Sequence, residues 1–306
     1  MNKQFDASLI KDVQTKWIPY DFKNQNIDDF LENLDIDKTV EISSIQGGYS
    51  NAIKQLDKFI EVGYQDYAKY RSDPSKEASS QLSPYFHHGQ ISTHEVFEKI
   101  SELESWSPES INPKMVGRRE GWWGSSENFE SFMDELITWR ELGYHTCVRR
   151  ANYNQYSSLP EWAIKTLHEH SSDEREYVYS LEELTYSQTH DEIWNAAQNQ
   201  LRTQGIIQNY LRMLWGKKIL EWTPSPQIAL SYMITLNDRF SLDGRDPNSY
   251  SGVFWILGRY DRAWGPERSI YGKIRYMTSD STAKKFNLKP YLEKWGNESL
   301  GAFTSL

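Results

Sequence analysis

Two tryptophans stand seven positions apart in the segment NYLRMLWGKKILEW, which also carries an arginine and two lysines. At about 100° per residue, seven steps bring Trp215 and Trp222 to nearly the same side of a helix, roughly 10 Å apart along its axis. Indole rings at this spacing suit either of two roles, packing in a core or passing single electrons. The spacing by itself leaves both roles open.

Several common chemistries are excluded by the motifs that the sequence lacks. No GxGxxG follows a strand-like run and no GxxxxGK[ST] occurs, so dinucleotide and triphosphate sites of the common kinds are not expected. His168 and His170 lie near carboxylates in LHEHSSDE, but two residues apart they diverge on a helix, so no metal site is expected. The serines lack the glycine-flanked turn of a hydrolase nucleophile.

Other polar residues stand within aromatic segments. In SSQLSPYFHHGQIS, Ser79, Ser80 and Ser83 could bind a phosphate through hydroxyls and backbone amides, or could form an ordinary helix-capping loop. In DELITWREL, Glu135 and Trp139 are four positions apart and are predicted to share one face of an α-helix. That pair suits a substrate pocket, or a surface carboxylate beside a core tryptophan.

The composition is that of a globular protein rich in aromatic rings. The 306 residues are 38% hydrophobic and include 12 Trp and 19 Tyr, which is enough for a sizeable core. The lone cysteine, Cys147, excludes an internal disulfide and fits a reducing compartment. No apolar run of roughly eighteen residues occurs, and the first residues lack a signal-peptide pattern. A cytoplasmic location without membrane contact is therefore expected.

Charge is unevenly distributed along the chain. The net charge of −9 argues against indiscriminate coating of nucleic acid. Between Arg259 and Lys294, however, nine Lys or Arg residues stand against four Asp or Glu, a local net charge of +5 (9 − 4). Such a segment can be a solvated surface or a phosphate-binding face.

The spacing of apolar residues predicts helices along most of the chain, whereas strand patterns are scarce. Ser92, with Glu95 three residues later, is typical of a helix N-cap, as is Thr189 or Asp191, and Gly205 is typical of a helix end. We predict an all-α protein with a polar, partly helical lead over 1–45 and one helical domain over 46–306. The expected helices are 27–34, 49–71, 92–103, 127–148, 161–170, 189–205, 206–222 and 225–238.

These segments, in this order, resemble the FAD-binding catalytic domain of class II cyclobutane pyrimidine dimer (CPD) DNA photolyases, which belong to the photolyase/cryptochrome family. The resemblance covers residues 47–286, and LDGRDPN, MLWGKKILEW, YDRAW and GKIRYM are its most distinctive motifs. It implies a helical domain that binds FAD without a Rossmann unit. It also implies light-driven repair of pyrimidine dimers in damaged DNA, by electron transfer from excited reduced FAD.

The resemblance implies FAD contacts for a set of residues in four segments. Arg212 and Asp243 match paired charges beside the isoalloxazine, although the same pair could be a buried structural salt bridge. Asn237 matches an asparagine that faces flavin N5. The implied FAD-binding residues are Tyr67, Ser79, Ser80, Gln81, Leu82, Ser83, Arg140, Arg212, Asn237, Asp243, Gly244 and Arg245.

A second implied set would hold the flipped-out lesion. Glu135 matches a carboxylate that donates a hydrogen bond to the dimer when it is protonated or shares a proton. Trp139 and Trp255 match aromatic walls of the pocket. The implied catalytic residues are Glu135, Trp139, Asn209, Tyr210, Met213 and Trp255.

Trp215 and Trp222 coincide with two members of the tryptophan chain that reduces the flavin in class II enzymes, and Trp194 coincides with the third. Arg262 and Trp264 are expected to enter the gap that the lesion leaves in the DNA. The resemblance therefore favours electron transfer over core packing for the three tryptophans.

The sequence also departs from the family pattern. Only some 45 residues precede the domain, where the family has an N-terminal α/β domain, so an antenna chromophore within this chain is not expected. The segment WILGRYDRAW is one residue shorter than usual between Trp255 and Arg262, and Tyr260 stands where histidine is usual. A cryptochrome-like photoreceptor or regulator acting through a protein partner, and a flavoenzyme on a repurposed photolyase scaffold, are the alternatives.

Overall fold

The structure, a computed structural model, describes residues 16, 26–118 and 120–296, and the chain divides into two compact units. The smaller unit, Met1–Val40, contains α2 (Ile27–Glu32), where a helix is predicted. The helix begins after Asn26, whose Oδ1 accepts a hydrogen bond from the Asp28 amide at 3.0 Å. Most of the remaining predicted lead lies outside the described residues.

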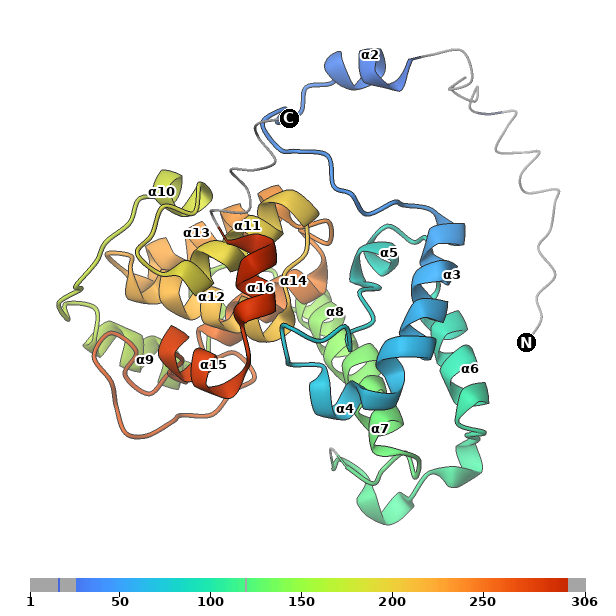
Figure 1. The fold of residues 1–306 in the computed structure, drawn as a ribbon. Coiled ribbons are helices and arrows are strands. Elements are labelled where there is room, and N and C mark those ends of the chain that lie inside the picture. The colour runs from blue at the N-terminus through green and yellow to red at the C-terminus, as the bar shows by residue number, and fades with distance from the viewer. Residues whose placement is uncertain (1–15, 17–25, 119, 297–306) are drawn as a thin grey trace. The chain divides into compact units, whose positions relative to one another are not determined.

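The larger unit, Glu41–Leu306, is helical, and the predicted all-α fold is confirmed (Figure 1). Its described part contains no β-strand, only an isolated antiparallel bridge between Arg268 and Gly272. No helix in residues 26–118 and 120–296 combines the length and the apolar character that a bilayer crossing requires. The α-helices are α3 (Tyr49–Lys58), α4 (Tyr67–Tyr70), α5 (Ser83–His87), α6 (Thr93–Leu103), α7 (Glu127–Met133), α8 (Arg140–Arg149), α9 (Glu161–Glu169), α10 (Leu181–Thr185), α11 (Glu192–Gln204), α12 (Asn209–Glu221), α13 (Pro226–Phe240), α14 (Pro247–Ile256), α15 (Ser279–Lys285) and α16 (Lys289–Trp295).

An aromatic core joins α3, α4 and α7. Phe59, at the end of α3, lies 5.7 Å from Tyr67 and 5.2 Å from Phe132 between ring centroids. Tyr67 meets Phe132 edge to face at 5.3 Å. This core fixes α4 against α7 and so places the start of the segment that follows α7.

A second core surrounds α12, which packs against α11, α13 and α14. Every residue from Leu214 to Leu220 is buried, including two lysines, so the helix is enclosed on all sides rather than amphipathic. Helix α14 also packs against α8, which connects this core to the first one.

Helix ends that depend on local sequence are where they are predicted. Ser92 caps α6 by accepting from the His94 amide at 3.1 Å, and Asp191 caps α11 by accepting from the Trp194 amide at 3.0 Å. Gly205 ends α11 in the left-handed conformation, with φ of 75°.

Two predicted continuous helices are interrupted. The helix predicted over 49–71 contains a π-helix at Phe59–Gly63, and the one predicted over 127–148 contains a π-helix at Asp134–Trp139. In a π-helix the amide bonds five residues back, so each adds a residue relative to the α-helical pattern. The apolar spacing gave no sign of these insertions.

Candidate functional site

A charged cluster lies where α12 and α13 face the loop after α13. The Arg212 Nη1 donates to Asn237 Oδ1 at 2.7 Å, and Arg212 Nη2 lies 3.9 Å from Asp243 Oδ1. Burial alone would raise the pKa of Asp243, but Arg212 and the hydroxyls of Ser241 and Ser83 hold that pKa below its ordinary value. The predicted Arg212–Asp243 pair is therefore an ion pair, with Asn237 bound to the same guanidinium.

The serine loop before α5 meets this cluster. Beyond the Ser83 hydroxyl, His87 Nδ1 lies 3.2 Å from Asp246 Oδ2 and His88 Nε2 lies 3.1 Å from the Leu242 carbonyl oxygen. These contacts hold the C-terminal end of α5 against residues 242–246. The structure therefore brings together two of the segments to which FAD contacts are assigned, although they are about 160 positions apart.

Both loops hold unusual backbone. Gln81 and Arg245 have φ values of 53° and 66°, in the left-handed region that side chains other than glycine rarely adopt. A Cβ on Gly244 would lie 3.0 Å from the Asp238 Cα and from the Ser241 carbonyl oxygen. Of the remaining loop residues, Leu82 is buried, Ser79 is half-buried, and the Ser80 carbonyl accepts from Gln55 Nε2 at 2.9 Å.

Tyr67 and Arg140 have different surroundings. Tyr67 is buried among aromatic rings, and burial, with Glu135 nearby, raises its pKa well above the ordinary value. Arg140 pairs with Glu141 at 2.6 Å and lies 4.5 Å above the Tyr144 ring. The Tyr144 hydroxyl donates to Asp246 at 3.5 Å, so Arg140 connects with the loop after α13 through that tyrosine.

Glu135 and Trp139 do not lie on an α-helix, so the predicted helix type for this pair is wrong. They belong to the π-helix Asp134–Trp139, and the Trp139 Nε1 donates to Asp134, five positions back, at 2.8 Å. Glu135 instead forms an ion pair with Arg71, whose side chain is only 18% exposed. The spacing of four residues cannot distinguish an α-helix from a π-helix that contains one extra residue.

Trp139 belongs to a cluster of three aromatic rings. The Trp139 and Trp255 ring centroids are 4.4 Å apart, and Tyr260 lies 6.4 Å from Trp139 and 6.1 Å from Trp255. The Tyr260 hydroxyl is hydrogen-bonded to Thr146. The two predicted pocket walls are therefore neighbours, and the tyrosine that replaces the usual histidine is the third ring.

The start of α12 is connected to Glu135 through Arg71. Gln208, the N-cap of α12, donates from Nε2 to the Arg71 carbonyl oxygen at 2.9 Å. The next residues, Asn209 and Tyr210, are exposed and half-buried, and Met213 one turn later is half-buried. Tyr210 packs on Phe286 at 4.9 Å, with the Lys285 ammonium 4.4 Å above its ring. Arg71 could not be singled out from residue spacing, because its partner is 64 positions away.

The three predicted electron-transfer tryptophans are all buried, and Trp194 contacts each of the other two. Trp194, Trp215 and Trp222 have 0%, 1% and 2% of their surface exposed. The Trp194 and Trp222 centroids are 5.6 Å apart, the Trp194 Nε1 donates to the Trp215 carbonyl oxygen at 2.9 Å, and Trp215 donates to Gln198 at 2.8 Å. Trp194 thus touches both of the other two.

Arg262 and Trp264 form a cation–π stack. The Arg262 guanidinium lies 4.4 Å from the Trp264 ring centroid, and Arg275 lies 5.2 Å from the same centroid. Trp264 is held by a hydrogen bond from Nε1 to Asp261 at 3.0 Å. Arg262 and Arg275 are exposed, so the stack presents positive charge to solvent.

Lys217 lies next to this region and is completely buried. Its Nζ donates to the Ile256 carbonyl oxygen at the C-terminal end of α14, one residue after Trp255. Burial lowers its pKa from 10.5 to about 7, Asp261 opposes this shift, and Arg275 adds to it. Lys217 therefore anchors the end of the helix that carries Trp255.

We expect Lys217→Met to abolish one contribution to the pH dependence of stability. Between pH of about 7 and 10.5 the unfolded chain binds a proton at Lys217 that the folded chain largely lacks. The free energy of unfolding contributed by Lys217 therefore rises with pH across this window. Urea unfolding of both proteins should show the wild type gaining stability relative to Lys217→Met as pH increases. A constant difference would contradict a buried lysine with a lowered pKa.

Comparison with known proteins gives relatives along most of the chain. No family model matches the chain. A deoxyribodipyrimidine photo-lyase from Methanothermobacter thermautotrophicus is 39% identical over 267 residues, which cover 87% of this chain and 55% of that protein. The chain spans about half the length of the curated relatives that it matches.

Solved structures agree on the fold. A class III photolyase from Agrobacterium tumefaciens has a TM-score of 0.58 at 19% identity, covering 81% of this chain and 44% of its own. A photolyase from Sulfolobus tokodaii, solved with two FAD molecules, has a TM-score of 0.55 at 17% identity, covering 90% and 51%. The chain is thus similar in sequence to deoxyribodipyrimidine photo-lyases over most of its own length, and it shares its helical fold with these solved photolyases.

Proposed function

We propose that this protein binds FAD and uses light to repair cyclobutane pyrimidine dimers in DNA, as a class II deoxyribodipyrimidine photolyase, with residues 46–306 as the catalytic domain. The 39% identity to a deoxyribodipyrimidine photo-lyase supports this function. The observation that carries it is the contact between Trp139 and Trp255, which come from separate helices and whose ring centroids are 4.4 Å apart. The π-helix that carries Trp139 also carries Glu135, which forms the ion pair with Arg71.

The residues around Arg212 fit FAD. A flavin that accepts negative charge needs a cation beside it, and Arg212 is a cation fixed by Asp243. The 2%-exposed Asn237 offers an amide for a ring nitrogen. Gly244 lets the loop after α13 pack closely on the end of that helix, because a Cβ there would lie 3.0 Å from the Asp238 Cα. The hydroxyls and amides of Ser79, Ser80 and Ser83 would hold the diphosphate, with the remaining contacts from Tyr67, Gln81, Leu82, Arg140 and Arg245.

FAD, when bound, supplies electrons on excitation by light. The chain's own residues bind and position the substrate. Trp139 and Trp255 would stack the flipped-out bases, with Asn209, Tyr210 and Met213 beside them. Because an ionised carboxylate can only accept hydrogen bonds, the pairing with Glu135 makes Arg71 the group that donates to the lesion carbonyl, with Glu135 orienting it.

Duplex DNA would be held through the basic segment. Arg262, Trp264 and Arg275 form a stack with both guanidinium groups in solvent, and the surrounding segment carries a net charge of +5. Arg262 and Trp264 would occupy the place of the extruded lesion. Attraction to phosphates makes this binding salt-dependent.

The test is repair of dimer-containing DNA by the purified protein under blue light, with a dark control and undamaged DNA as the binding control at matched salt. We expect yellow protein that releases FAD on denaturation. It should split pyrimidine dimers only in light. Protein that binds FAD but repairs nothing would favour the photoreceptor or the repurposed flavoenzyme. Colourless protein that cannot be reconstituted with FAD would refute the family assignment of the site.

We expect Trp255→Ala to weaken binding of dimer-containing DNA. Stacking on an aromatic contributes roughly 1 to 3 kcal/mol per base, so the dissociation constant should rise by about 10-fold or more. Binding is measured by fluorescence anisotropy with damaged and undamaged duplexes. Trp295→Ala, a half-buried tryptophan on α16, is the control. An equal loss of affinity for both duplexes in Trp255→Ala would show that the residue acts outside the lesion pocket.

A further inference from the structure

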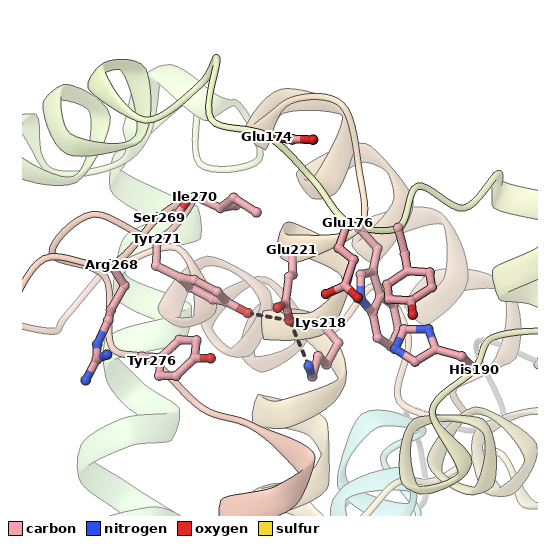
Figure 2. Close-up of a pocket in the computed structure, with 12 residues that line it drawn as sticks. Glu174, Glu176, His190, Lys218, Glu221, Arg268, Ser269, Ile270, Tyr271 and Tyr276 are labelled. Carbon is pink, nitrogen blue, oxygen red and sulfur yellow. Dashed lines mark hydrogen bonds and ion pairs between the residues drawn. The ribbon is translucent and has the colours of Figure 1, made fainter.

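A pocket of about 450 Å³ lies at the outer end of the tryptophan cluster, in the size range of small-molecule sites (Figure 2). Four segments form it: the stretch before α10, the turn between α10 and α11, the C-terminal end of α12, and residues 268–276. Trp222 is one of the lining residues. None of the roles proposed above uses this pocket.

The pocket touches the tryptophan cluster directly. Trp222 contacts Trp194 at 5.6 Å on its inner side, and on its outer side His190 and Tyr179 lie 5.3 Å and 5.4 Å from it. Tyr177 stacks on His190 with centroids 3.9 Å apart. A planar molecule in the pocket would therefore meet aromatic faces and the ring of Trp222.

The charges of the pocket select among planar molecules. Lys218 is neutralised by Glu221 at 2.8 Å, and the Tyr271 hydroxyl donates to the same carboxylate at 3.1 Å, as Figure 2 shows. The lining then adds Glu174 and Glu176 against Arg268. Three carboxylates against two cations disfavour an anion, and carboxylates accept hydrogen bonds. The best ligand is neutral, aromatic and equipped with hydroxyl or N–H donors.

We propose that this pocket binds a small neutral aromatic reductant of the hydroquinone class, which delivers an electron to Trp222. The role in electron delivery rests on the proposed light-driven function. One O–H bond of the reductant breaks. The reductant gives one electron to the Trp222 radical cation, which becomes the neutral indole, and the proton from that O–H bond goes to the Glu176 carboxylate. The reductant leaves as a neutral phenoxyl radical.

Binding is tested in the dark, without any photochemistry. Hydroquinone is titrated into the protein while tryptophan fluorescence and the heat of binding are recorded, with ascorbate, an anion, as the comparison. Saturable binding of hydroquinone and none of ascorbate is expected. Tyr177→Ala, which removes an exposed stacking wall, should weaken binding by about 10-fold. Tyr186→Ala removes an exposed tyrosine outside the pocket and should bind like the parent.

Delivery of the electron is tested in light with the holoprotein. The rate of flavin reduction should saturate with hydroquinone in the parent and in Tyr186→Ala, and in Tyr177→Ala it should reach half its maximum only at about 10-fold higher hydroquinone. Absence of saturable dark binding, or equal binding by Tyr177→Ala, overturns the pocket assignment whatever the light reaction does. If hydroquinone binds in the dark but neither reductant supports flavin reduction in light, the pocket is real and its electron-delivering role is refuted. In that case the tryptophan path of the proposed function has failed, and the pocket assignment has not.

Discussion

Trp194→Phe is expected to lower the rate of light-driven flavin reduction by an order of magnitude or more. Trp194 touches both other tryptophans, through the Trp222 ring at 5.6 Å and the Trp215 carbonyl oxygen at 2.9 Å. A phenyl ring is much harder to oxidise than an indole, so an electron would lose the only redox-active ring that is in ring contact with Trp222 among these three tryptophans. The rate is measured from flavin absorbance under blue light with a fixed reductant.

The control for Trp194→Phe is Trp123→Phe. Trp123 is also buried but belongs to the aromatic cluster around Trp106 and Phe129, far along the chain from α11. Loss of the Trp194 Nε1 hydrogen bond costs about 1 kcal/mol of stability, which thermal unfolding will report separately. Unchanged photoreduction in a folded, FAD-loaded Trp194→Phe protein would show that the three tryptophans are only a core.

Glu135→Ala is expected to slow splitting of the dimer by about 100-fold. The substitution leaves the Arg71 guanidinium, 18% exposed, without the carboxylate that orients it. Loss of one positioned donor in a catalytic step typically costs on the order of 3 kcal/mol. Glu135→Gln keeps the shape and an amide oxygen for Arg71, so a smaller loss is expected. Repair yield per absorbed photon is measured for both variants.

Arg71→Met separates the two groups of this pair. If Arg71 is the donor, Arg71→Met should lose as much activity as Glu135→Ala, whereas a protonated Glu135 acting alone would leave Arg71→Met active. FAD content and photoreduction should remain normal in all three proteins. Repair at the parental rate in both Glu135→Ala and Arg71→Met would remove this pair from the mechanism.

The sequence predicted those features that depend on neighbours along the chain. The caps at Ser92 and Asp191 and the stop at Gly205 follow from side chains and backbone within one helical turn, and all three are confirmed. The all-α fold follows from the apolar spacing and the scarcity of strand patterns, and it is also confirmed. The Arg212–Asp243 pair came from the family resemblance, and the structure shows the two charges as an ion pair.

Features that depend on distant contacts could not be predicted. Trp215 lies on α12 beside two buried lysines and Trp222 follows the last residue of that helix, so no apolar face distinguishes a core role from another. Arg71 acquires its partner only when α4 packs on α7. The pocket beside Trp222 is assembled from segments nearly a hundred residues apart. Each of these three features depends on packing between segments that are far apart in the sequence. The spacing of residues along one sequence does not reveal such packing.

The π-helix at Asp134–Trp139 has a consequence for insertions and deletions in this protein. Removing one residue there would restore regular α-helical hydrogen bonding, and locally the shorter helix would be the less strained one. The same deletion would turn everything on one side of it by about 100° relative to the other. Glu135 and Trp139 would then no longer meet Arg71 and Trp255 together. Because α7 belongs to the aromatic core and α8 packs on α14, loss of a single codon in this stretch should disturb the packing between the two cores as well as the contacts of Glu135 and Trp139. The extra residue of the π-helix is thus part of the register between the two halves of the domain, and not a local irregularity that can be trimmed away.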